Sequence, residues 1–199
     1  MTYDVSLHNI QDEVLRIDFT KIYDVILKYT EKAINQEKHY EEIDEVWRRL
    51  DGTTISESMK SLLSLATYLF YIEGIYMLSI DVIIYYLIQD CHDIWSEEKR
   101  IFVDEFEDLN RIPLATKLKF LEKHDYSETV KLCDRKLRNA IAHHEFEIQP
   151  DGTVDYYHYG KKNETNNYEL RQRINDIYVM FAFINEQRAK ALRADTSRA

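Results

Sequence analysis

Chain breakers and cysteines are scarce in this sequence of 199 residues, which has 4 glycines, 2 prolines and 2 cysteines. So few glycines and prolines argue against a β fold with many tight turns and favour long helices. Cys91 and Cys133 belong to no Cys-x-x-Cys or Cys/His metal pattern, so we expect reduced thiols and no structural metal or other cofactor. The triplet Cys91-His92-Asp93 has metal-ligating residue types but is too compact to form a site alone.

Long hydrophobic runs are also missing. The most apolar region, 61–89, is interrupted by Glu73 and Asp81, and its longest uncharged run is 12 residues. A helix that crosses a bilayer needs about 20 apolar residues. The N-terminal region is polar and acidic and has no signal-peptide pattern. We therefore expect a buried helix, a cytoplasmic location and no membrane partner.

Acidic residues are in excess, and they are unevenly distributed. The net charge of −10 argues against a general nucleic-acid coat, which would be basic. Residues 111–138, however, contain eight Lys/Arg against four Asp/Glu, which gives this window a charge of +4. A basic face on an acidic body is compatible with a phosphate-bearing ligand that reaches one site only.

The sequence has no internal repeat, low-complexity tract or Pro/Ser-rich linker, so we predict a single domain over 1–199. Apolar residues at helical spacing predict a mainly α bundle. Its expected helices are 18–50, 56–89 after a cap at Thr54 or Ser56, 96–107 after a cap at Ser96, 114–123 after Ile112-Pro113, and 168–191 with Ile174, Ile177, Tyr178, Phe181 and Ile184 on its buried face. The tail 193–199 is expected to fray.

One further helix is predicted from Ser127 to His143 or His144. Its buried face is given by the spacing of Val130, Cys133, Leu137 and Ile141. The period then changes to strict alternation on both sides of the turn signal Pro150-Asp151-Gly152. This change predicts a β-hairpin from 145–148 and 154–159, followed by a polar loop over 161–167.

The end of this helix carries the sequence Arg138-Asn139-Ala140-Ile141-Ala142-His143. On a continuous helix, Lys131, Arg135 and Arg138 would form one cationic face, and Asn139 and His143 would be neighbours. Arg138 and His143 would lie about 140° apart in projection, so they could flank a common substrate.

These residue types suit work on a phosphodiester. Histidine exchanges protons near neutral pH, arginine binds phosphate in a bidentate way, and asparagine can hydrogen-bond either group. The alternative is a structural role, in which Arg138, Asn139 and His143 only cap the helix and compensate its dipole, because cations favour a helix C-terminus. His144 projects toward Ile141 and Leu137, which favours a structural role for it.

The stretch Leu137 to His143 resembles the R-x(4–6)-H signature of the HEPN superfamily (higher eukaryotes and prokaryotes nucleotide-binding). Arg138 and His143 supply the two signature residues, and Asn139 supplies a polar residue directly after the arginine. The resemblance implies a HEPN-like helical bundle that forms a homodimer with the two motifs facing each other. The excess of acidic residues and the predicted hairpin after the motif depart from the family pattern.

The same resemblance implies metal-independent cleavage of RNA that leaves 2′,3′-cyclic phosphate and 5′-hydroxyl ends. His143 would transfer protons, Arg138 would stabilise the phosphate, and Asn139 would orient them. We assign Lys131, Arg135 and Lys136 to RNA binding because they lie in the basic window. Such proteins often act as toxins or in anti-phage defence, which would add an antitoxin or regulatory protein as a partner.

Two alternatives stay open from the sequence. The chain could be a non-catalytic HEPN-like module that dimerises and binds RNA, a nucleotide or a protein. Separately, Tyr156, Tyr157, His158 and Tyr159 could stack on unpaired bases, although aromatic side chains on a half-buried hairpin more often serve packing.

Overall fold

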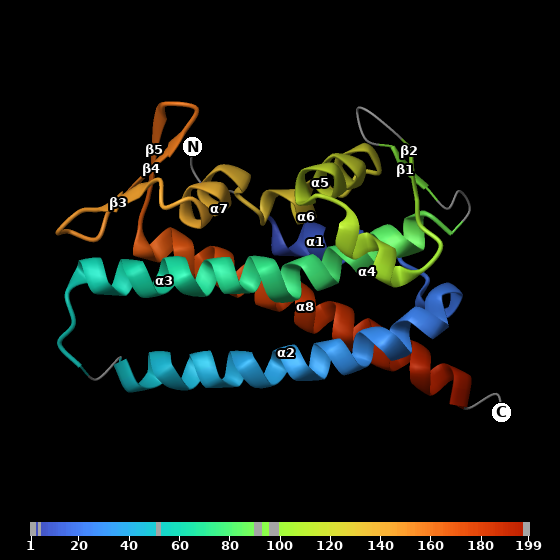
Figure 1. The fold of residues 1–199 in the computed structure, drawn as a ribbon. Coiled ribbons are helices and arrows are strands. Elements are labelled where there is room, and N and C mark those ends of the chain that lie inside the picture. The colour runs from blue at the N-terminus through green and yellow to red at the C-terminus, as the bar shows by residue number, and fades with distance from the viewer. Residues whose placement is uncertain (1–2, 4, 51–52, 90–92, 96–99, 197–199) are drawn as a thin grey trace.

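The computed structural model describes residues 3, 5–50, 53–89, 93–95 and 100–196. The fold is mainly α, as predicted, with a small sheet after the motif helix (Figure 1). The α-helices are α1 (Leu7–Leu15), α2 (Tyr23–Leu50), α3 (Glu57–Tyr71), α4 (Met77–Leu87), α5 (Leu114–Lys123), α6 (Ser127–Lys131), α7 (Arg135–Ala142) and α8 (Asn167–Thr196). Short 3-10 helices, η1 (Phe19–Ile22) and η3 (Phe106–Arg111), precede α2 and α5.

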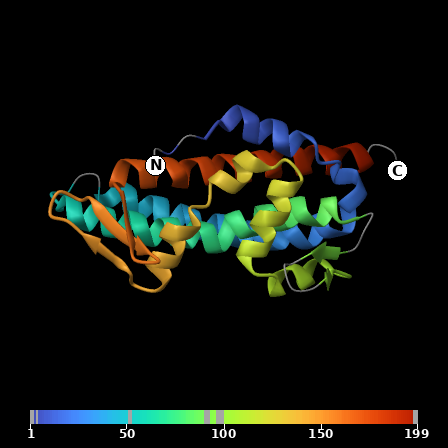
Figure 2. The same ribbon diagram turned by 90° about the horizontal axis from the view of Figure 1, so that it is seen from above.

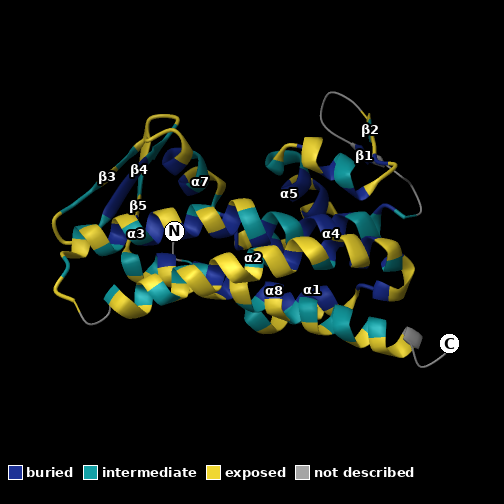
Figure 3. Ribbon diagram, turned by 60° about the horizontal axis from the view of Figure 1, so that its bottom comes forward, coloured by how far each residue is buried: buried dark blue, intermediate teal, exposed yellow. Residues whose placement is uncertain are grey.

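The long helices run along the molecule, and the short ones cover one side of them. In Figures 1 and 2, α2, α8 and the continuous α3–α4 rod extend over the whole length, while α5, α6 and α7 lie on the side of the rod away from α2. Figure 3 shows buried residues concentrated along α4 and exposed residues along α2. Ile26, Tyr29 and Ala33, which recur at helical spacing on α2, are all buried, as is Ile22 in η1.

A π-helical turn, η2 (Ile72–Tyr76), joins α3 to α4 within the predicted helix 56–89. Such a turn leaves a backbone N–H without its usual helical acceptor. Here the Ile75 N–H donates to the Tyr40 hydroxyl of α2, at 3.1 Å. Gly74 allows this approach, because a Cβ at that position would lie 2.5 Å from the Tyr40 hydroxyl oxygen. Gly74 therefore lets α2 pass close to η2.

The α3–α4 rod is the one described segment that has the length and composition of a membrane span. It covers Glu57–Leu87, and 67% of its most apolar 18-residue window is buried inside the protein. Glu73 and Asp81 are both in this segment. Asp81 forms a buried ion pair with Lys117 of α5 at 2.6 Å, so one charge in this apolar helix is neutralised within the core.

The predicted motif helix is broken into two. α6 ends at Lys131, and α7 begins at Arg135 after a cap at Asp134. The prediction of one cationic face shared by Lys131, Arg135 and Arg138 is therefore wrong, because Lys131 is on a separate helix. α6 is anchored instead by α1, which the sequence did not predict: the buried Glu13 carboxylate accepts from the N–H groups of Glu128 and Thr129.

Four further predictions are also wrong. Arg100–Phe102 forms strand β2, which pairs with β1 (Asp93–Trp95), where a helix over 96–107 was expected; residues 96–99 lie outside the described residues. Residues 161–165 form strand β5 rather than a polar loop. At the C-terminus, α8 continues through Thr196 instead of fraying from 193. Tyr178, expected on the buried face of α8, is exposed.

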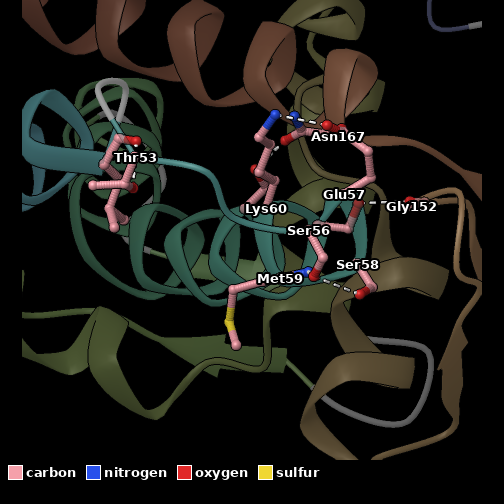
Figure 4. Close-up of polar contacts among 11 residues, drawn as sticks. Thr53, Ser56, Glu57, Ser58, Met59, Lys60, Gly152 and Asn167 are labelled. Atoms are coloured by element: carbon pink, nitrogen blue, oxygen red, sulfur yellow. Dashed lines mark hydrogen bonds and ion pairs between the residues drawn. The ribbon is translucent and has the colours of Figure 1, made fainter.

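The hairpin prediction is confirmed and extended to three antiparallel strands. β3 (Phe146–Ile148) pairs with β4 (Val154–His158), which pairs with β5 (Lys161–Thr165). The beginning of α3 holds this sheet (Figure 4). Ser56 caps α3 through the Met59 N–H, and the Ser61 hydroxyl donates to the Gly152 carbonyl in the β3–β4 turn.

We predict that Gly74→Ala destabilises the protein by about 1–3 kcal/mol, because the added methyl group collides with the Tyr40 hydroxyl and disrupts its bond to the Ile75 N–H. Urea denaturation would measure the loss. The double variant Gly74→Ala/Tyr40→Phe removes the colliding oxygen and should lose less than the sum of the two single variants. Additive losses would contradict the proposed contact.

Candidate functional site

Asp134 organises the N-terminal end of α7. Its Oδ1 accepts from the N–H groups of Lys136 and Leu137, which is the usual way in which aspartate caps a helix. Its Oδ2 accepts from the Tyr156 hydroxyl of β4 at 3.1 Å and lies 3.7 Å from the Arg173 guanidinium of α8. Its backbone N–H donates to the buried Tyr68 hydroxyl of α3. One residue therefore fixes α7 against three other elements.

The C-terminal end of α7 has the hydrogen bonds of a Schellman motif. The Glu145 N–H donates to the Ala140 carbonyl at 2.8 Å, and the His144 N–H donates to the Ile141 carbonyl at 3.2 Å. His144 takes the left-handed conformation, with φ of 58°, that glycine usually supplies at this position. Its side chain is exposed, so the expected position beside Ile141 in the core is wrong. Its structural role is in the backbone instead.

His143 is the C-cap residue of α7, and its side chain is exposed. Within the described part of the chain, its imidazole has no hydrogen-bond or ion-pair partner. Its backbone N–H donates to the Asn139 carbonyl, which confirms that these residues are one helical turn apart. The imidazole is therefore accessible to a substrate or to a second chain.

Arg138 is held by two neighbours. Its Nε and Nη2 lie 2.6 and 2.5 Å from Oε1 of Glu73 in η2, and its Nη1 donates to the Asn139 side-chain oxygen at 3.1 Å. Both residues of the Arg138–Glu73 pair are partly exposed. The guanidinium is therefore oriented, but a carboxylate now occupies the donors that would bind a phosphate.

A groove of about 990 Å³ borders α7 at Arg135, Lys136 and Asn139. Asn139 and the three residues assigned to RNA binding, Lys131, Arg135 and Lys136, line it. Lys162 of β5 and Arg173 of α8 also line the groove. Its acidic lining residues are Asp134 and Glu164. Cations therefore outnumber acids in the groove, whereas the chain as a whole is acidic.

The cations predicted from the sequence window differ in their accessibility. Lys131 pairs with Glu128, and Arg111 pairs with Asp108. Lys117 is fully buried against Asp81, so it cannot contribute to a basic surface. Arg135 and Lys136 are exposed and have no carboxylate partner among the described residues. At the groove, the exposed cations of the predicted window are therefore Lys131, Arg135 and Lys136, and the last two have no carboxylate partner among the described residues.

Chemistry that needs a thiolate or a metal finds little support near α7. Burial raises the pKa of Cys133 to about 12, so this groove residue stays a neutral thiol at physiological pH. Among the described residues, no three His, Cys, Asp or Glu side chains lie close enough to hold a metal ion. Cys91 and His92 lie outside the described residues.

The residues missed by sequence reasoning are Glu73, Asp134 and Arg173. Glu73 was counted only as an interruption of an apolar helix, and its contact with Arg138 joins positions 65 residues apart. Asp134 carried a local signal, because an aspartate followed by a basic, apolar helical pattern is a typical N-cap. Arg173 had none.

Comparisons with known proteins leave the HEPN resemblance as a prediction. No protein-family model, curated protein sequence or solved structure matches this chain. The features that bear on function are therefore the geometry of α7, its contact with Glu73 and the cation-lined groove.

We predict that Asp134→Ala costs about 2–4 kcal/mol of unfolding free energy, since it removes a helix cap and leaves Tyr156 and Arg173 without their shared acceptor. Asp18→Ala is a matched control: Asp18 caps η1 through the Thr20 N–H on an exposed surface. Its loss should stay near 1 kcal/mol or below. Equal losses in chemical denaturation would show that Asp134 acts only as a local cap.

Proposed function

We propose that this chain is a metal-independent endoribonuclease of HEPN type that acts as a homodimer with a composite active site. The observation that supports this most directly is the arrangement of three side chains at the end of α7. Arg138 is bound to the Asn139 amide, and the exposed His143 imidazole follows Asn139 by one helical turn. Phosphate binding and proton transfer are thereby available at one helix end, beside a groove lined by cations.

In the proposed reaction, the ribose 2′-hydroxyl attacks the adjacent phosphorus. An imidazole accepts the hydroxyl proton as the new P–O bond forms. The bond to the 5′-oxygen breaks, and that oxygen takes a proton from a second group. The products are a 2′,3′-cyclic phosphate and a 5′-hydroxyl. Arg138 stabilises the extra negative charge on the phosphate during the transfer.

A dimer would supply the second proton-transfer group. One chain offers one His143, whereas a complete acid–base cycle uses two such groups. A two-fold axis near the end of α7 would bring together both copies of Arg138, Asn139 and His143. The exposure of His143, His144 and Glu145 leaves this helix end accessible to such contact.

One observation favours the non-catalytic alternative. The Arg138 guanidinium is paired with Glu73, so a phosphate must compete with a carboxylate for its best donors. A dimerisation module that binds RNA, a nucleotide or a protein through the groove needs no free Arg138. Roles as a toxin or anti-phage factor, and control by an antitoxin or regulatory protein, belong to the catalytic proposal.

The test is cleavage of single-stranded RNA in EDTA. We predict that the wild type cuts it and leaves 2′,3′-cyclic phosphates, while Arg138→Ala and His143→Ala each lose at least 100-fold in rate, an order-of-magnitude expectation for removing charge stabilisation or acid–base catalysis. Mapping of the ends by enzymatic labelling would identify the products.

Matched controls separate this effect from general loss of charge. Arg49→Ala and His39→Ala remove exposed side chains of the same types from α2. Both should cleave like the wild type. If none of the proteins cuts RNA, or if all five cut alike, the catalytic proposal fails.

The Glu73 carboxylate should act as a competitor for the RNA phosphate. We predict that Glu73→Gln lowers KM for RNA by about 1.5- to 5-fold, because an exposed ion pair is typically worth about 0.2–1 kcal/mol. The value of kcat should stay unchanged if Arg138 keeps its bond to Asn139. Glu57→Gln, which breaks the exposed pair with Lys60, is the control. A raised KM in Glu73→Gln would instead identify Glu73 as a residue that positions Arg138.

A further inference from the structure

The turn between β4 and β5 has an unusual residue at its tip. Tyr159 and Gly160 form a two-residue loop between the paired residues His158 and Lys161, with φ of 49° and 72°. Both positive φ angles are those of a type I′ turn, which favours Asn-Gly or Asp-Gly. A tyrosine in the left-handed region is strained, because its Cβ crowds the backbone.

Folding does not explain this tyrosine. Its side chain is 94% exposed, so it buries almost no apolar surface within the chain. Its ring centroid lies 4.3 Å from that of His158, with the planes tilted by 52°. In contrast, Tyr156 on the same strand is buried and donates its hydroxyl to Asp134. Tyr156 thus serves packing, whereas the ring of Tyr159 is exposed and contacts the ring of His158.

This ring contacts a residue that lines the cation-lined groove, His158. His158 and Lys162 line the groove, and Lys161, next to the turn, is exposed. Arg173 lines it from α8 and is only 8% exposed. Its Nε is buried without a hydrogen-bond partner, although a buried donor normally has one. The Arg173 guanidinium also pairs with Asp134 and lies over the Tyr3 ring. The groove therefore contains a buried cation with one unsatisfied donor, and the exposed ring of Tyr159 adjoins His158 in its lining.

We propose that Tyr159, supported by His158, forms a base-stacking subsite for an unpaired nucleobase of an RNA strand whose phosphates lie in the groove. The inference rests on the proposed function only in taking RNA as the ligand. Stacking on an exposed ring needs a base that has left its duplex, so the subsite selects single-stranded segments. Arg135 and Lys136, exposed cations that line the groove, suit the phosphate backbone of such a strand.

The decisive variant is Tyr159→Asn. Asparagine suits the first position of a type I′ turn, so the variant removes the ring while keeping or improving the stability of the hairpin. In a His143→Ala background, which prevents cleavage, we expect the Kd for a fluorescent 12-nucleotide poly(A) strand to rise about 5- to 150-fold. Tyr159→Trp should bind at least as well as tyrosine. Fluorescence anisotropy would measure the binding, and thermal unfolding would check the fold.

A second probe separates stacking from charge. A 12-nucleotide strand of abasic ribose phosphates has the same backbone without bases. The protein with Tyr159 and the Tyr159→Asn variant should bind this strand with equal Kd. Phe102→Ala removes an exposed aromatic side chain from β2, at the opposite end of the molecule in Figure 1, and should leave poly(A) binding unchanged.

The outcomes distinguish this inference from the proposed nuclease. Unchanged poly(A) binding by Tyr159→Asn overturns the subsite, even if the wild type cleaves RNA. Equal weakening for poly(A) and the abasic strand also overturns it, as does wild-type protein that binds neither. Selective loss of poly(A) binding supports the subsite, and it does so even if the wild type has no cleavage activity.

Discussion

The site depends on the four-way contact of Asp134. A single carboxylate caps α7, accepts from Tyr156 in the sheet and pairs with Arg173 of α8, while the same residue's N–H bonds to Tyr68 of α3. These contacts are partly buried, where an unpaired polar group is costly. They set the position of α7 between the rod, the sheet and α8. Asp134, Tyr156 and Arg173 also line the groove.

Much of the fold could be predicted from local patterns. The limits of α5 at Leu114 and Lys123, the end of the motif helix near His143 and the hairpin around Gly152 all follow from periodicity and turn residues. The break between α6 and α7 was missed, because apolar spacing continues across it through Val130, Cys133 and Leu137, although Asp134 carried the signal of a helix N-cap. The break is decided by tertiary partners of Asp134, which lie 22 to 66 residues away.

The candidate site was only half visible in the sequence, for the same reason. The motif residues Arg138, Asn139 and His143 are local to one helix, so their spacing was informative. The carboxylate that binds Arg138 comes from η2, and η2 exists because Tyr40 of α2 accepts from the Ile75 N–H beside Gly74. A π turn rotates the side chains that follow it relative to a regular helix. A prediction from helical spacing therefore misplaces them.

The two halves of the site lie on different sides of α7, and Asn139 is the link between them. Arg138 reaches toward η2, while Arg135 and Lys136 reach into the groove. Asn139 lines the groove and also accepts from the Arg138 guanidinium. In the proposed nuclease, a strand held in the groove would pass over Asn139 to place a phosphate at Arg138, with His143 one turn farther along the helix. Under that proposal, the polar residue after the arginine would couple the surface that binds the strand to the groups that act on it, because Asn139 contacts both.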